Sequence, residues 1–260
     1  MIRGLYTSGW SMLANNKKLD VISNNLANAD TNGYKKDTVV FQSFPDLLTK
    51  RINDTQSKLN PSGNIGSMQL GSDIGEVYTY YNQGQMAKTD DNLDMAIQDT
   101  GSAFFTVGVD DGNGNLKQYY TRDGAFILNS NGQIATNDGN VVLGEDGKPI
   151  TLNGDNFTVQ GDGTIIQNNQ EVGKLLITQF TDTTSLRKFG SNLVEATGTS
   201  VQQPFNGSVA QGYLEQSNVN IVKEMVDMIS VMRSYETNQK MVQIEDSTLD
   251  KAVNEVGAIR

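Results

Sequence analysis

Residues that share one face of a helix recur at both ends of the 260-residue chain. Near the N-terminus, positions spaced by three or four place mostly apolar side chains on one face; these are Leu5, Gly9, Met12, Asn16, Leu19, Ile22 and Leu26. The polar turn sequence Asp-Thr-Asn-Gly at residues 30–33 ends the pattern. The sequence therefore predicts one amphipathic helix before residue 30.

The C-terminal pattern predicts a second, longer helix. Its face consists of Met225, Ile229, Met232, Tyr235, Gln239, Val242, Leu249, Val253 and Val256, with a polar interruption at Glu245-Asp246. Ser217 or Asn218 is the expected N-cap, and Asn220 is a weaker candidate. Because the spacing is close to a heptad repeat, this face is suited to a coiled coil.

Short strands joined by tight turns are predicted for the middle of the chain. From residue 118 onward, Asp-Gly and Asn-Gly pairs interrupt short apolar or alternating runs, at residues 123–124, 131–132, 138–139, 146–147, 153–154 and 162–163. Residues 174–180 (KLLITQF) form the clearest further strand. A calcium-binding solenoid would need a nonapeptide repeat that the sequence lacks. The pattern therefore favours a twisted β-meander or irregular barrel, and an α+β fold for the whole chain.

The distribution of glycine and proline supports the same division of the chain into two helical ends and a β-rich middle. Of the 26 glycines, 22 lie between residues 61 and 212, and residues 1–44 and 205–260 contain no proline. We therefore expect a discontinuous helical domain made of residues 1–45 and 212–260, a linker or extension at 46–75, and a β-rich domain at 76–211. The two helical ends cannot bury their apolar faces inside the β-rich domain without long connections, so we expect them to pack on each other or on neighbouring subunits.

The stability of the helical ends is expected to depend on assembly. A long amphipathic helix alone in water is only marginally stable. We therefore expect both ends to be poorly ordered in the isolated chain and to fold when subunits assemble.

Composition narrows the chemistry that the chain can perform. It contains no Cys and no His, which excludes disulfides, thiolate or imidazole metal sites, and Ser-His-Asp or Cys-His catalysis. The net charge is −10, although residues 1–60 carry 8 Lys/Arg against 5 Asp/Glu, so nucleic acid is not an expected partner. No apolar run is long enough for a transmembrane helix, and the N-terminus lacks the pattern of a cleavable secretory signal.

Three candidate sites have simpler structural explanations. Residues 110–115 (DDGNGN) begin like a calcium loop but lack the Gly and Glu needed at its sixth and twelfth positions, so a surface hairpin loop is expected. The carboxylates at residues 90–94 could serve a glycosidase, but such clusters arise by chance in a chain with 30 Asp/Glu. Tyr78 and Tyr80 could stack on sugars, yet they share one strand face, where cross-strand packing is the expected role. No catalytic, metal-binding or cofactor-binding residue is predicted.

Three stretches of the sequence carry motifs found together in one protein family. Residues 23–35 (SNNLANADTNGYK) fit the pattern N-N-L-A-N-x-x-T-x-G-[FY]. The second stretch is 212–220 (GYLEQSNVN), continuing through 224–229 to 233–238 (RSYETN). The third is internal and comprises Gln83-Gly84, Thr89, 92–97 (NLDMAI), Phe104-Phe105 and 120–126 (YTRDGAF). Together they closely resemble the flagellar basal-body rod and hook axial proteins, in the same order and over most of the chain.

The resemblance implies a structural function and specific partners. Such proteins stack into helical tubes, with terminal helices in an inner coiled-coil layer and a β-rich domain outside. It implies that this chain polymerises with itself, contacts other rod proteins and the hook protein at the ends of the rod, and transmits torque from motor to hook. It also implies a location in the flagellar basal body, export by the flagellar type III apparatus without signal cleavage, and no nucleic acid, small-molecule substrate, cofactor or enzymatic activity.

The resemblance and the apolar faces together predict an assembly interface. Its expected members are Leu5, Met12, Leu19, Ile22, Asn25, Leu26, Asn28, Asn32, Gly33, Tyr34, Glu215, Ser217, Asn218, Val219, Asn220, Met225, Ile229, Met232, Tyr235, Asn238, Val242 and Leu249. One departure is that the family often has G-x-G-F-F where residues 99–105 are DTGSAFF, which implies a locally rebuilt turn.

Several alternatives remain at this point. Within the family, residues 46–74 resemble the linker of distal rod members, and a proximal rod paralogue is the alternative. A carbohydrate-binding or carbohydrate-cleaving surface protein would show a concave pocket with two carboxylates about 5–10 Å apart. A phage or secretion-tube subunit would share helical termini around a β domain, but the N-N-L-A-N motif argues against it.

Overall fold

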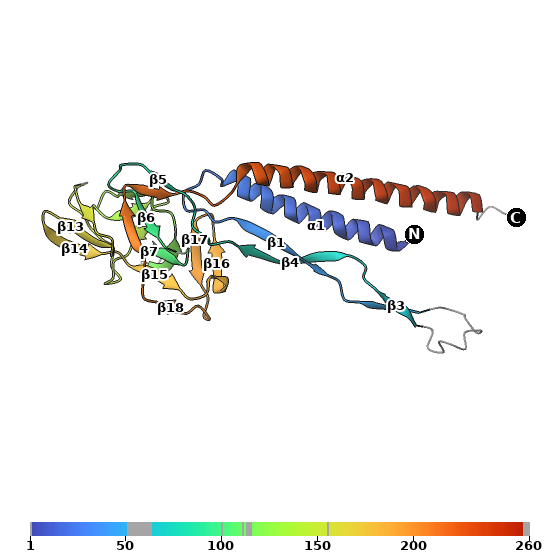
Figure 1. Cartoon of the computed structure of the whole chain (residues 1–260), viewed down its shortest axis with the longest axis horizontal. Coiled ribbons are helices and arrows are strands. Elements are labelled where there is room, and N and C mark those ends of the chain that lie inside the picture. The colour runs from blue at the N-terminus through green and yellow to red at the C-terminus, as the bar shows by residue number, and fades with distance from the viewer. Residues whose placement is uncertain are drawn as a thin grey trace. The chain divides into compact units, whose positions relative to one another are not determined.

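The chain has one long helix at each end and many short strands between them, so the predicted α+β class is confirmed (Figure 1). The computed structural model describes residues 2–50, 64–99, 101–110, 112, 116–154 and 156–256. Part of the predicted linker, including residues 61–63, and most of the loop at 110–115 lie outside the described residues. In the described part of the chain, no helix is long and apolar enough to cross a membrane.

The chain divides into two compact units. Unit 1 comprises Met1–Asn24, Asp37–Tyr78 and Val222–Arg260, and unit 2 comprises Asn25–Lys36 and Thr79–Ile221. By compactness, residues 25–36 therefore belong with the β-rich unit and residues 37–78 belong with the helices. The domain boundaries that were expected from the distribution of glycine and proline stay a prediction.

Unit 1 combines two helices with a narrow β-ribbon. The helices are α1 (Ile2–Ala27) and α2 (Ile221–Lys251), and a π-helical turn (Ala252–Val256) follows α2. In the ribbon, β1 (Asp37–Ser43) pairs with β4 (Ser72–Thr79), and β2 (Leu47–Lys50) pairs with β3 (Asn64–Met68). The predicted helices are thus present.

Helix α1 contacts both the ribbon and α2. The Trp10 ring packs edge-on against Phe44, with 5.1 Å between ring centroids, and Thr7 Oγ1 donates to Leu70 O at 3.1 Å. On another side, the Glu245 carboxylate of α2 occupies the space that a Cβ at Gly4 would need. Within unit 1, α1 therefore lies between the ribbon and α2 (Figure 1).

Unit 2 is built around a nine-stranded sheet with the order β16-β17-β8-β7-β11-β10-β9, in which β15 also pairs with β7 and with β18. Its strands are β7 (Ala103–Asp110), β8 (Leu116–Thr121), β9 (Phe126–Leu128), β10 (Ile134–Thr136), β11 (Val141–Val142), β15 (Ile177–Phe180), β16 (Leu186–Phe189), β17 (Leu193–Ala196) and β18 (Gln202–Gln203). A 3-10 turn, Thr183–Ser185, precedes β16.

Smaller sheets complete unit 2. The strands β12 (Thr158–Val159), β13 (Thr164–Gln167) and β14 (Gln170–Lys174) form one of them. Strand β19 (Ser208–Gln211) pairs with β6 (Met95–Gln98), and β20 (Tyr213–Glu215) pairs with β5 (Met86–Lys88), all antiparallel. Strands from the C-terminal part of the chain thus close onto strands that precede β7.

The central strand β7 separates two clusters of buried side chains. Phe105 and Val107 belong to the larger cluster, with residues such as Met95, Ile134 and Ile165. Phe104 lies in the smaller cluster and packs edge-on against Phe180, with 6.0 Å between ring centroids. This division follows from the alternation of side chains along a strand.

Two predicted details were wrong. Residues 174–180 do not form one strand, because the N–H groups of Leu175 and Leu176 donate to Gly163 O and Leu143 O in other segments. Helix α2 begins at Ile221, directly after Asn220, so Ser217 and Asn218 are not at its start. The Asn218 amide instead accepts from Lys36 N at 2.8 Å and donates to Tyr80 O at 2.8 Å.

Candidate functional site

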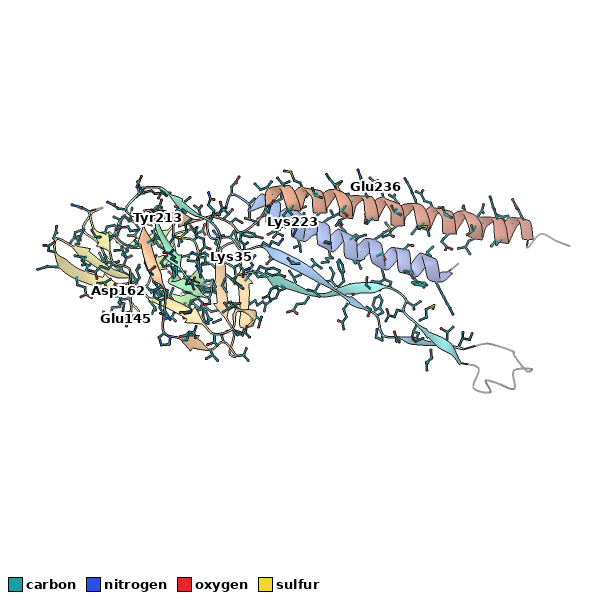
Figure 2. The ribbon with its side chains drawn as sticks, in the orientation of Figure 1. Lys35, Glu145, Asp162, Tyr213, Lys223 and Glu236 are labelled. Carbon is teal, nitrogen blue, oxygen red and sulfur yellow. The ribbon has the colours of Figure 1, made fainter. Side chains whose placement is uncertain are left out.

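The three sequence motifs meet at one buried group of charges in unit 2. Lys35 comes from the first motif, Arg122 from the internal motif and Glu215 from the third, and Asp99 follows β6. Each side chain is at most 3% exposed. Figure 2 shows Lys35 among the strands of unit 2. We call these four residues the anchor cluster.

The two carboxylates of the anchor cluster bind both cations and several backbone amides. Glu215 Oε1 accepts from Lys35 Nζ at 2.5 Å and from Gly84 N at 2.8 Å, while Oε2 accepts from Arg122 Nη1 at 3.1 Å. Asp99 pairs with Arg122 Nη2 and accepts from three backbone N–H groups, at residues 101–103. This turn lies where the sequence departs from the family pattern.

The cluster is electrically balanced and fixed by its surroundings. Two cations face two carboxylates, which offsets the large cost of removing each charge from water. Burial lowers the pKa of Lys35, and the Glu215 carboxylate opposes that shift. Lys35 Nζ also donates to Asn82 O at 2.9 Å, and the Arg122 guanidinium lies 5.4 Å from the centre of the Phe104 ring.

Glycines allow the motif segments to approach each other. Gly33 has a φ of +68°, and a Cβ there would overlap the backbone of Arg122 and Asp123. A Cβ at Gly84 would overlap the carbonyl of Gln216, and one at Gly124 would overlap the carbonyl of Met95. The glycines of the motifs are therefore explained by backbone packing around the anchor cluster.

The aromatic and amide residues of the first motif extend this packing. Tyr34 is buried and its hydroxyl lies 3.2 Å from Asn25 Oδ1, to which it donates. Lys188 Nζ lies 4.3 Å from the centre of the Tyr34 ring and donates to Lys35 O at 2.6 Å. The segment that leads out of α1 is thus held to β16.

The structure places the predicted interface residues in three environments. Ile22, Asn25, Gly33, Tyr34 and Glu215 are buried within the chain. Thirteen of them are half-buried, namely Leu5, Met12, Leu19, Leu26, Asn28, Asn32, Ser217, Asn218, Val219, Tyr235, Asn238, Val242 and Leu249. Asn220, Met225, Ile229 and Met232 are exposed. Sequence reasoning missed Lys35, Arg122 and Asp99, although the first two lie inside the quoted motifs.

Residues of the first and third motifs also line an open cleft in unit 2. Its volume is about 730 Å³, and Asp30, Asn32 and the segments 83–85 and 216–221 surround it. The lining is mostly amide and backbone groups. Across the described residues, no group of three Asp or Glu side chains is placed to hold a metal ion.

Three family models match the chain in the order of its motifs. They are described as "Flagella basal body rod protein" (residues 5–35), "Flagellar hook protein FlgE/F/G D1 domain" (residues 96–167) and "Flagellar basal body rod FlgEFG protein C-terminal" (residues 210–255). The first and third models cover the segments that supply Lys35 and Glu215, and the second covers Asp99 and Arg122.

Full-length relatives agree with the family models. The chain is 37% identical to the flagellar basal-body rod protein FlgG of Buchnera aphidicola subsp. Acyrthosiphon pisum, over 96% of this chain and 98% of the relative. It is 32% identical to the flagellar hook-basal body complex protein FlhO of Bacillus subtilis, over the whole of both chains. It is 33% identical to FlgG of Borreliella burgdorferi, over 98% of each.

The chain belongs to the flagellar basal-body rod and hook protein family. Within it, the chain is a structural subunit of the rod.

Proposed function

We propose that this rod subunit polymerises through its helical ends into a helical tube, and that the exposed apolar row on α2 is the main contact surface. Val222 is 72% exposed, Ile229 52% and Met232 51%. Over its 31 residues α2 has only two buried side chains, Glu224 and Val231. Such a row of exposed apolar side chains is a sign of an interaction surface.

Helical geometry places the exposed apolar row on the side of α2 that the chain itself does not cover. Ile229 and Val231 are two residues apart, which is about 200° around a helix. Since Val231 is buried, Ile229 points away from the side that the chain itself covers. Val226 and Ile244, which share the outer side of α2 with Ile229, are also exposed. A neighbouring subunit that covers this row would bury it in a coiled-coil layer.

The other exposed apolar surface of unit 1 lies on the ribbon. Leu47, Leu48 and Ile65 are all more than half exposed. A two-stranded ribbon is marginally stable alone in water, so contact with another subunit would stabilise it. Because the surfaces on α2 and on the ribbon differ, their contact would be heterologous, which generates open helical polymers when the rotation does not close.

We place the chain in the distal part of the rod. The relatives named FlgG and the resemblance of residues 46–74 to the distal rod linker support this position. Other rod proteins and the hook protein are then its partners at the two ends. We further propose that it acts without catalysis, transmits torque, and leaves the cytoplasm through the flagellar export apparatus without cleavage of a signal.

The test uses a flagellated strain that lacks its own copy of the gene. Ile229→Asp places a charge in the apolar row, and we expect it to abolish swimming and to leave no complete rods in electron micrographs of isolated basal bodies. Leu26→Asp is expected to do the same. Ile229→Leu keeps the surface apolar, and Thr248→Asp adds the same charge at another exposed position of α2, so both should support swimming. Complete rods with Ile229→Asp would rule out the proposed interface.

A further inference from the structure

A small cavity lies beside the anchor cluster in unit 2. Its lining includes Gly33, Lys35, Arg122, Lys188 and Asn192, and the apolar ring of Phe104. Its volume is about 10 Å³. That is about the space that one water molecule requires, and it is too small for a larger ligand.

Arg122 and Asn192 both line this cavity, and each carries one buried polar atom that makes no hydrogen bond to the described residues. Arg122 Nε has a hydrogen to donate, and Asn192 Oδ1 is an acceptor. Buried polar atoms without a partner are rare in native proteins, and internal water molecules are a common partner for them. The cavity thus brings together one donor and one acceptor.

We propose that one internal water molecule occupies this cavity, accepting from Arg122 Nε and donating to Asn192 Oδ1. The bridge connects the anchor cluster to the turn between β16 and β17, which contains Asn192. It makes a bound solvent molecule part of the charge network that holds the first motif in unit 2. The proposal concerns unit 2 alone and stands independently of the polymer contacts proposed above.

The amide orientation favours water over an anion. Asn192 Nδ2 donates to Asp123 Oδ2 at 3.2 Å, so Oδ1 is the atom left without a partner. An anion next to a carbonyl oxygen would be repelled, whereas water can donate to it. Lys35 and Arg122 also have no charge left to neutralise, because Glu215 and Asp99 balance them.

The Asn192 backbone is fixed independently of its side chain. Thr121 Oγ1 donates to Asn192 O at 2.9 Å, and Leu193 pairs with Thr121 across β17 and β8. The position of the acceptor therefore does not depend on the water. A substitution of the side chain should remove the water site without moving the turn.

The first test counts long-lived internal water molecules by oxygen-17 magnetic relaxation dispersion on the full chain. We expect Asn192→Leu, which removes the acceptor and fills space, to show one long-lived water fewer than the wild type. Asn131→Leu, at an exposed Asn-Gly turn of the same unit, should show no loss. An unchanged count for Asn192→Leu in a folded chain would overturn the proposal.

A second test does not depend on any variant. In a crystal structure of the wild-type chain at about 1.2 Å resolution, we expect one solvent peak within about 3.2 Å of both Arg122 Nε and Asn192 Oδ1. An empty cavity would overturn the proposal. So would an anomalous bromide peak at that position after a bromide soak, because it would identify an anion site.

Discussion

Glu215 uses both carboxylate oxygens inside unit 2, and this explains why a glutamate stands at this position. Oε1 binds Lys35 and Gly84, while Oε2 binds Arg122. Gln would retain an acceptor at one of these positions but would remove the negative charge. It would leave Lys35 and Arg122 with Asp99 as their sole carboxylate within the cluster.

We therefore expect Glu215→Gln to lower the free energy of unfolding by about 3–5 kcal/mol, the cost of leaving a buried charge without its partner. Urea unfolding followed by near-ultraviolet circular dichroism measures this change. Glu195→Gln is the control, because Glu195 forms an ion pair with Lys117 in which both side chains are more than a third exposed. Such a pair contributes about 0–1 kcal/mol. Equal effects of the two substitutions would contradict the anchoring role of Glu215.

Gly33 illustrates a second constraint at the residue scale. Gly33 and Gly139 both have positive φ, +68° and +86°. A Cβ at Gly33 would overlap the Arg122 backbone, whereas a Cβ at Gly139 would have no atom within 4 Å. Alanine at either position incurs about 1–2 kcal/mol for the left-handed backbone.

We expect Gly33→Ala to destabilise the chain more than Gly139→Ala, by a further ~1–3 kcal/mol from overpacking. Thermal unfolding of the two variants side by side separates backbone strain from steric overlap. If the two alanine variants unfold at the same temperature, the close approach of residue 33 to Arg122 contributes nothing to stability.

The residues of the site were only partly predictable. The motifs contain Lys35, Arg122 and Glu215, but nothing in their spacing indicates that they meet, because 180 residues separate Lys35 from Glu215. Asp99 carries a local turn signal, because its carboxylate accepts from the N–H groups of residues 101–103, two to four residues ahead. Its pairing with Arg122 is non-local, and no pattern in the sequence indicates it.

The helices were the most predictable elements. Their apolar spacing is a local property, so α1 and α2 follow from the sequence to within a few residues at each end. The strand predicted at 174–180 failed for a non-local reason, since Leu175 and Leu176 bond to two different segments. Short apolar runs show that strands are present, but the partner of each strand depends on the whole sheet.

The two kinds of element should differ in local stability. Helix α2 buries two of its 31 residues, whereas the first six residues of β7 are all buried. We expect amide hydrogens of α2 to exchange much faster than those of β7 in the isolated chain, because helix opening exposes little apolar surface. Hydrogen exchange followed by mass spectrometry measures both segments in one experiment. Equal protection would mean that α2 is already stable without neighbouring subunits.

At the scale of the whole molecule, unit 2 depends on both ends of the chain. Its residues come from 25–36 and 79–221, and β20 pairs with β5 close to its C-terminal limit. A chain that ends at Asn220 keeps Glu215 and β20, whereas a chain that ends at Gly212 lacks both. The two truncations differ by eight residues, none of them in α2.

We expect the chain ending at Asn220 to unfold cooperatively in urea and the chain ending at Gly212 to lose that transition. The reason is that the shorter chain leaves Lys35 and Arg122 with a single buried carboxylate. Near-ultraviolet circular dichroism of the buried tyrosines reports the difference. A cooperative transition of equal midpoint in both chains would mean that β20 and Glu215 are dispensable for unit 2.

The separation of Lys35 from Glu215 along the chain also determines when unit 2 can fold during translation. A ribosome adds about 5–20 residues per second, so Glu215 is made about 10–40 s after Lys35. During that interval Lys35 has no Glu215 to bind, and the first motif cannot complete its contacts. Contacts so distant in sequence also form slowly once both partners are present. The nascent subunit therefore remains incompletely folded until most of its length has been synthesised, and its last motif determines when unit 2 can close.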